Sequence, residues 1–215
     1  MERITLGRTG LTINRCGFGG IPIQRVDEDQ AVETVRHAVE QGVDFIDTSR
    51  AYTTSEGRIG KALKLTDKKV ILASKSVSRK SEDVQADLEK SLSELQVDHI
   101  DLYQCHYVST QEDYQRVVQS EGAFDTLVKA KEEGLISHIG ITSHSLEVLE
   151  QALIDGLFET IMVCFSFLEP AAKELIIPKA LEKNIGVIAM KSFSGGVIDN
   201  PVLALKWALF EIICN

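Results

Sequence analysis

Short apolar stretches alternate with longer amphipathic ones along most of the chain. Each apolar stretch is a few residues long and rich in β-branched side chains, which is typical of a buried strand. These stretches lie at residues 16–20, 43–48, 70–75, 100–106, 138–142, 160–166 and 186–191. Their starts are roughly 22 to 38 residues apart, about the length of one strand–helix unit. The pattern therefore predicts seven such units in succession.

The segments between these strands carry signals for helix starts and ends. Asp27 followed by Gln30 predicts a capping box, and Ser81 is expected to cap a helix whose apolar stripe runs from 84 to 95. Pro170 is expected at the first position of a helix, and Asn200-Pro201 predicts a cap followed by such a proline. Helix exits that need a left-handed residue are expected at Gly42, Gly134 and Gly156.

Strict alternation of strands and helices predicts a parallel sheet covered on both faces. An open doubly wound sheet would be expected to carry GxGxxG after its first strand, and residues 17–20 (GFGG) lack the third glycine. Seven regular units also suit a closed barrel better. We therefore predict an α/β protein, a (β/α)8 TIM-type barrel, in which residues 4–15 (ITLGRTGLTINR) form an N-terminal β-hairpin that plugs the bottom.

A complete barrel of this type takes about 250 residues, and this chain has 215. Residues 212–215 fall where an eighth strand would be starting, so the barrel is expected to be incomplete at its C-terminal end. We expect the whole chain, residues 1–215, to form a single domain.

Composition narrows the class of partner. With 44% hydrophobic and 26% charged residues the chain resembles an ordinary globular protein, and a net charge of -9 argues against nucleic acid. The apolar runs are too short to cross a bilayer, and the N-terminus lacks the apolar core of a secretion signal. The cysteines show no CxxC spacing and are interpreted as small buried residues in a reducing compartment, the cytoplasm: Cys16, Cys105, Cys164 and Cys214.

Four polar side chains fall at the C-terminal ends of three consecutive predicted strands, where barrels carry their chemistry. Asp47 ends the second strand and Tyr52 follows it, Lys75 ends the third, and His106 ends the fourth. Each residue alone has an ordinary explanation as a cap, a solvated charge or a packed ring. Their occurrence together at matching strand ends is much harder to assign to chance.

This combination suits reduction of a carbonyl group. Hydride transfer leaves negative charge on the carbonyl oxygen, which then needs a proton donor within hydrogen-bond reach. We expect the Lys75 ammonium to lower the pKa of the Tyr52 phenol, and Asp47 to pair with Lys75. His106 would orient and polarise the carbonyl, and no metal is required.

Two segments resemble signatures of the aldo-keto reductase family. These are residues 45–63, FIDTSRAY followed by SEGRIGKAL, and residues 92–106, LSELQVDHIDLYQCH. The resemblance runs from about Ile4 to the C-terminus. It implies NAD(P)H-dependent reduction of aldehydes or ketones, or the reverse oxidation of alcohols, by the tetrad Asp47, Tyr52, Lys75 and His106, with Tyr52 as general acid or base.

The resemblance also implies a cofactor site for NADP(H), with NAD(H) as an alternative. By position it comprises Gly19, Gly20, Asp47, Ser143, His144, Met162, Met190, Lys191 and Ser192. His144 stands where the family usually has asparagine, Met162 where it has glutamine, and Met190 where a tyrosine commonly stacks on the nicotinamide. Both methionines have an equally good interpretation as core residues. The segment Met190-Lys191-Ser192 is similar to a bacterial-type branch, some members of which carry an iron–sulfur extension.

Two other functions remain open at this stage. One is a weakly active or inactive aldo-keto reductase-like module that binds or regulates a partner, and the other is an aldolase that uses Lys75 through a Schiff base. The expected partner is a small carbonyl compound rather than a nucleic acid or a membrane, and the oligomeric state stays open.

Overall fold

The computed structural model describes residues 2–213, and the chain divides into two compact units. The described part of unit 1 lies within residues 1–4, 12–106 and 115–139, and that of unit 2 within 5–11, 107–114 and 140–215. Hydrogen bonds join seven strands in chain order, β3-β4-β5-β6-β7-β8-β9, and a separate sheet consists of β1 and β2. The prediction of a single domain stays a prediction.

The strands fall where the apolar stretches predict them. The long sheet contains β3 (Phe18–Gly19), β4 (Phe45–Asp47), β5 (Ile71–Ser76), β6 (Ile100–Cys105), β7 (Ile136–Ser143), β8 (Thr160–Cys164) and β9 (Gly186–Met190). Pairing is parallel between β3 and β4, β4 and β5, β5 and β6, β7 and β8, and β8 and β9. The predicted α/β class and the predicted hairpin, β1 (Arg3–Thr5) with β2 (Thr12–Asn14), are confirmed.

Helices occupy the segments between the strands. They are α1 (Glu28–Glu40), α2 (Ser55–Leu63), α3 (Ser81–Leu95), α4 (Gln111–Val118), α5 (Ala123–Glu132), α6 (Leu146–Asp155), α7 (Ala172–Leu175), α8 (Ile177–Glu182) and α9 (Pro201–Ile213), with short 3-10 turns η1 (Gly7–Thr9), η2 (Pro22–Arg25) and η3 (Ser194–Gly196). Asp27 caps α1 by accepting from the Gln30 amide at 2.8 Å, as expected. The expected glycines follow α1, α5 and α6 with φ of 97°, 78° and 67°.

Two predicted helix starts are wrong. Ser81 is the first residue of α3 rather than its cap, and its hydroxyl instead accepts a hydrogen bond from the Thr126 hydroxyl at 2.8 Å. Pro170 precedes the cap residue of α7, Ala171, and is not the first helical residue. At Ser81 this tertiary contact outweighs the local sequence signal.

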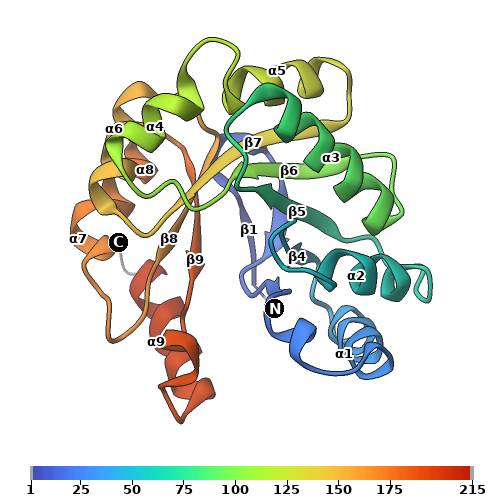
Figure 1. Ribbon diagram of the computed structural model, residues 1–215. Helices are drawn as coiled ribbons and strands as arrows, with labels where there is room; N and C mark the ends of the chain where they lie inside the picture. The colour runs from blue at the N-terminus through green and yellow to red at the C-terminus, as the bar shows by residue number, and fades with distance from the viewer. Residues whose placement is uncertain (1, 214–215) are drawn as a thin grey trace. The chain divides into compact units, whose positions relative to one another are not determined.

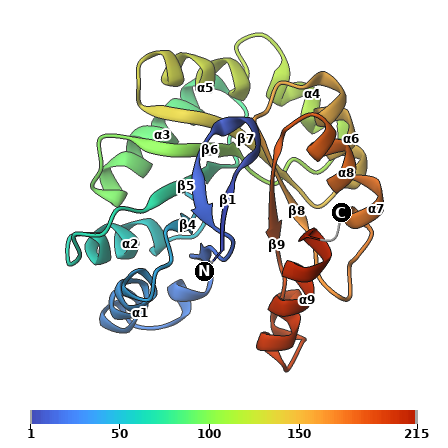
Figure 2. The same cartoon turned by 180° about the vertical axis from the view of Figure 1, so that it is seen from behind.

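In unit 1, α1, α2, α3 and α5 follow one another along the outer side of β4, β5 and β6 (Figures 1 and 2). The apolar faces of these helices are buried, through residues such as Val35 on α1, Ile59 on α2 and Leu88 on α3. The helices cover the outer side of β4, β5 and β6, and polar side chains occur at the carboxyl ends of these strands.

In unit 2, the turn of the N-terminal hairpin covers the starts of β8 and β9. The Arg8 amide donates to the Asn184 carbonyl at 2.6 Å, and its guanidinium donates to the carbonyls of Gly156 and Phe158. A Cβ on Gly186 would lie 2.7 Å from the Leu6 side chain, so the two residues are in close contact. The hairpin turn therefore closes the N-terminal ends of these strands, as a plug would.

No eighth strand starts in the described part of residues 212–215. Ile212 and Ile213 belong to α9, which begins at Pro201. The Asn200 side chain caps this helix by accepting from the Leu203 amide at 3.0 Å. The cap and a segment rich in Leu and Ala favour a helix. Cys214 and Asn215 lie outside the described residues. Within the described chain, no helix has the length and apolarity needed to cross a membrane.

Candidate active site

Strand register brings the predicted tetrad together inside unit 1. Asp47 is the last residue of β4, Lys75 lies near the end of β5, and His106 directly follows β6. The register aligns Asp47 with Ala73 and Lys75 with Gln104. The carboxyl ends of three adjacent parallel strands thus deliver these side chains to one edge of the sheet.

A buried ion pair lies at the centre of the site. Lys75 Nζ donates to Asp47 Oδ2 at 2.6 Å and to the Thr48 carbonyl at 2.5 Å. The Lys75 side chain is 1% exposed and that of Asp47 is 15% exposed. Burial lowers the pKa of Lys75 and raises that of Asp47, and each effect is opposed by the charge of the other group. The pair therefore depends on both partners remaining in place.

Tyr52 is held over this ion pair by tight turns. Its amide donates to the Ser49 carbonyl at 3.0 Å, and its own carbonyl accepts from the Ser55 amide at 2.7 Å. The Lys75 ammonium lies 5.0 Å from the centroid of the Tyr52 ring. The His106 ring meets the Tyr52 ring edge to face, with centroids 5.7 Å apart. Tyr52 thus lies close to both Lys75 and His106.

The expected acidification of Tyr52 is wrong for the protein without a cofactor. Burial, with a further contribution from the Asp47 carboxylate, raises the pKa of Tyr52 to about 12. The Tyr52 phenol is therefore protonated at neutral pH.

His106 is held by a residue that sequence reasoning did not single out. Its Nδ1 lies 2.9 Å from Ser49 Oγ, and Ser49 is 1% exposed. The His106 carbonyl also accepts from the Arg79 guanidinium at 2.9 Å. Ser49 follows Asp47 by two residues, but nothing in its local sequence indicates a partner 57 residues away.

Gln104 is a second residue that was missed. It is fully buried and donates through Nε2 to Asp47 Oδ1 at 3.0 Å, so Asp47 is hydrogen-bonded on both oxygens. Its Oε1 is buried with no hydrogen-bond partner. Gln104 lies in β6 two residues before His106, which directly follows the strand, and the alternation of side chains places residues at this spacing on the same face. That alternation could have identified it.

A buried carboxylate supports the ion pair from the side. Glu56 on α2 is 1% exposed, forms a salt bridge with Arg50 and accepts from the Ser74 hydroxyl at 2.6 Å. Its negative charge helps to keep Lys75 charged, although burial remains the larger effect on the pKa of Lys75. Glu56 belongs to the SEGRIGKAL segment, so one role of this segment is to place a negative charge near Lys75.

The two glycines predicted to approach a cofactor differ in their surroundings. A Cβ on Gly19 would meet no atom within 4 Å, so the end of β3 is open at this residue. A Cβ on Gly20 would lie 2.5 Å from Ser55 Oγ, which also donates to the Gly20 carbonyl. Packing against α2 thus explains Gly20, whereas Gly19 leaves space for a ligand.

Unit 2 carries the other predicted cofactor residues. Ser143 is fully buried, and its hydroxyl donates to the Val108 carbonyl at 2.6 Å and accepts from the Ser145 amide at 2.9 Å. The His144 ring meets the Tyr107 ring edge to face at 4.9 Å. Partial burial and the nearby Lys191 cation lower the pKa of His144, so its ring is less readily charged than a solvated histidine. Ser143 is thus engaged within the protein.

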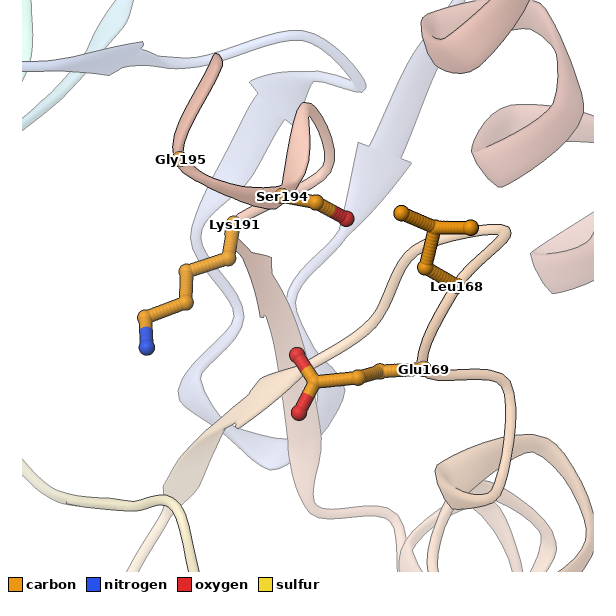
Figure 3. A pocket seen from close by; sticks show the side chains of 5 residues that line it. All are labelled: Leu168, Glu169, Lys191, Ser194 and Gly195. Atoms are coloured by element: carbon orange, nitrogen blue, oxygen red, sulfur yellow. The ribbon is translucent and has the colours of Figure 1, made fainter. Parts of the chain in front are cut away.

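The last four predicted residues lie within β8 or at and just after the end of β9. Met162 is 4% exposed and belongs to the core of unit 2, in agreement with its alternative interpretation, whereas Met190 and Ser192 are half-buried. Lys191 has a left-handed backbone with φ of 59° and lines a cavity of about 290 Å³ with Leu168, Glu169, Ser194 and Gly195. In Figure 3 the Glu169 side chain points toward the side of the cavity on which Lys191 lies.

The chemistry of these side chains fits an anionic dinucleotide in part. Lys191 offers a cation to a phosphate, but its ammonium points away from the Ser194 hydroxyl (Figure 3), which already contacts Ser166 Oγ at 2.8 Å. The Glu169 carboxylate in the same cavity opposes an anion. Across the described residues, no group of three or more His, Cys, Asp or Glu side chains is placed to hold a metal ion.

The chain is similar in sequence to a known protein family and to several of its members. The model of the aldo/keto reductase family matches residues 4–204. The chain is 32% identical to L-galactose dehydrogenase of Arabidopsis thaliana, over 92% of this chain and 67% of that protein. It is 29% identical to aldo-keto reductase YhdN of Bacillus subtilis, over 94% of this chain and 65% of that protein.

A solved structure shows the same fold. The holo form of aldo-keto reductase AKR11C1 from Bacillus halodurans superposes with a TM-score of 0.80 at 27% identity, covering 91% of this chain and 68% of that one. The chain thus spans about two thirds of the length of the relatives that it matches. It has their α/β barrel-type fold over that part, and it belongs to the aldo/keto reductase family.

Proposed function

We propose that the protein is an NAD(P)H-dependent oxidoreductase that reduces the carbonyl group of a small aldehyde or ketone, or oxidises the corresponding alcohol. The observation that carries the proposal is the Lys75–Asp47 ion pair held at 2.6 Å beside the Tyr52 ring. A module that only binds a partner has no need of a buried, desolvated ion pair next to a phenol, because such a pair is costly to maintain.

In this proposal Tyr52 is the general acid in the direction of reduction. A phenol with a pKa of about 12 is protonated at neutral pH. The alkoxide left by hydride transfer is a far stronger base than a phenolate, so the proton moves downhill from Tyr52 to the product oxygen. The Lys75 ammonium near the ring then stabilises the phenolate that remains.

His106 positions the carbonyl in this scheme. Its ring contacts the Tyr52 ring, so a carbonyl oxygen bound between the two would receive hydrogen bonds from both. Asp47 holds Lys75 by a hydrogen bond, Gln104 holds Asp47 in turn, and neither residue needs to touch the substrate.

The cofactor proposed is NADP(H), with NAD(H) as the alternative. The nicotinamide supplies or accepts the hydride. The residues proposed to hold the cofactor remain those that the family resemblance indicates. Gly19 and Lys191 have the best structural support, from the open position at Gly19 and the cation in the cavity. We also propose a cytoplasmic location, for which the free thiols of Cys16 and Cys164 are favourable.

The proposal is tested by combining a binding assay with a turnover assay. NADPH and NADH are titrated by cofactor fluorescence, and oxidation of each is followed with a panel of aldehydes and ketones. Carbonyl-dependent oxidation is expected with at least one cofactor. Tight binding without turnover across the panel would contradict the proposal and would favour a binding or regulatory role.

A further inference from the structure

Ser49 occupies a position between two acceptors in the active site. Its Oγ lies 2.9 Å from His106 Nδ1 and 3.2 Å from the Lys75 carbonyl oxygen, and it accepts from the Ala51 amide at 3.2 Å. The residue is 1% exposed, so bulk water does not compete for these contacts. A hydroxyl has one proton, so it donates either to Nδ1 or to the carbonyl.

The second acceptor already has a donor. The Lys75 carbonyl accepts from the Arg50 amide at 3.0 Å, so it stays hydrogen-bonded even when Ser49 donates to Nδ1 instead. The contact with Nδ1 is also the shorter of the two. The Ser49 proton therefore goes to Nδ1, and a neutral His106 that accepts there carries its own proton on Nε2.

We propose that Ser49 is a positioning residue that holds neutral His106 in the Nε2-protonated tautomer. Its relevance to turnover rests on the proposed function, since a histidine that polarises a carbonyl must present an N–H group to the oxygen. The opposite tautomer would present a lone pair and repel that oxygen. Ser49 does not touch the reacting atoms and acts through His106.

The same hydroxyl also accommodates a charged His106. A protonated Nδ1 donates to Ser49 Oγ, and the hydroxyl then rotates and donates to the Lys75 carbonyl at 3.2 Å. Both protonation states of the ring are thus held in one orientation, because the Ser49 proton has an acceptor in each case.

The tautomer is read directly from the ¹⁵N shifts of labelled histidine, with His106→Gln used to assign the His106 signals among the five histidines. In the wild type at alkaline pH, Nδ1 is expected to show the shift of an unprotonated, hydrogen-bonded nitrogen, and Nε2 that of a protonated one. Ser49→Ala is expected to remove the hydrogen-bonded character of Nδ1. A protonated Nδ1 in the neutral wild type, or an unchanged Nδ1 shift in Ser49→Ala, would overturn the inference.

Kinetics supply the second measurement. Loss of one neutral hydrogen bond to His106 is expected to lower kcat/KM about fivefold in Ser49→Ala, and Ser49→Thr, which keeps the hydroxyl, is expected to restore most of it. Ser91→Ala is the matched control, because it removes another fully buried hydroxyl, which contacts Tyr103. This control is expected to leave kcat/KM and the His106 shifts unchanged.

The two proposals fail separately. If the shifts behave as expected but no variant reduces a carbonyl, the Ser49 contact is supported and the proposed function is contradicted. If the enzyme is active but neutral Nδ1 is protonated, the function stands and the Ser49 inference is wrong.

Discussion

At the scale of single residues, the site depends on how burial redistributes protons among neighbouring groups. Lys75, Asp47 and Tyr52 are each shifted in pKa mainly by burial, and the ion pair opposes that shift for the two charged partners. The sequence alone suggested a simpler picture, in which the ammonium acts on the phenol. It predicted the pairing of Lys75 with Asp47, but it could not show how deeply the Tyr52 phenol is buried, and burial is the larger effect on its pKa.

The first prediction concerns the alkaline titration of Tyr52. We expect phenolate absorbance from Tyr52, taken as the difference between the wild type and Tyr52→Phe, to appear only near pH 12 in the cofactor-free protein. Because the unfolded tyrosine ionises near pH 10, the folded state binds more protons between these values, and stability falls as the pH rises through this window. Ionisation of Tyr52 below pH 10 would show that Lys75 does acidify it.

The second prediction concerns the ion pair. Asp47→Asn leaves the Lys75 side chain buried without a carboxylate, so the free energy of unfolding in urea is expected to fall by about 3 kcal/mol. Glu33→Gln, which breaks the exposed pair with Arg36, is the control and is expected to leave the free energy of unfolding nearly unchanged. Equal effects of the two substitutions would mean that the Lys75–Asp47 pair does not stabilise the site.

At the scale of elements, alternation of strands and helices was sufficient to predict the order and approximate bounds of β3 to β9. The tetrad was predictable for the same reason, since strand ends in a parallel sheet lie at one edge. Ser49 and Gln104 were missed because their partners are set by register between strands that are distant in sequence. The cap at Ser81 was wrong because its hydroxyl is taken by Thr126, a contact that no local pattern indicates.

The third prediction uses the adjacent glycines at the end of β3. Gly20→Ala places a Cβ 2.5 Å from Ser55 Oγ and is expected to lower the unfolding free energy by about 1–3 kcal/mol. Gly19→Ala meets no neighbouring atom and is expected to change it by less than about 0.5 kcal/mol. If Gly19 approaches the cofactor, as proposed, Gly19→Ala weakens cofactor binding although stability is kept. Unchanged affinity in Gly19→Ala would remove that residue from the proposed site.

At the scale of the whole molecule, family membership and the described site point to the same chemistry. The family model covers residues 4–204, a range that contains the tetrad and all nine residues proposed for the cofactor. The chain carries a net charge of -9, which repels an anionic ligand. A local cation such as Lys191 is therefore important for binding an anionic cofactor.

The fourth prediction concerns linkage between cofactor and stability. A cofactor that binds only the folded protein stabilises it by about 2.7 kcal/mol at a concentration of 100 Kd, so NADPH is expected to raise the Tm. Lys191→Met is expected to weaken this rise by raising the Kd. Lys179→Met, which removes an exposed cation paired with Glu150, is the control and should leave the rise unchanged. The role of Lys191 would be contradicted by equal shifts in both variants.

The most direct test is the rate of hydride transfer in a single turnover, measured by stopped-flow loss of NADPH fluorescence with a reducible aldehyde. Tyr52→Phe is expected to slow this step at least about 100-fold with cofactor affinity nearly unchanged, whereas Tyr103→Phe, which removes a buried hydroxyl bonded to Ser91, should stay within about twofold. Near-normal hydride transfer in Tyr52→Phe would contradict the assignment of Tyr52 as the proton donor.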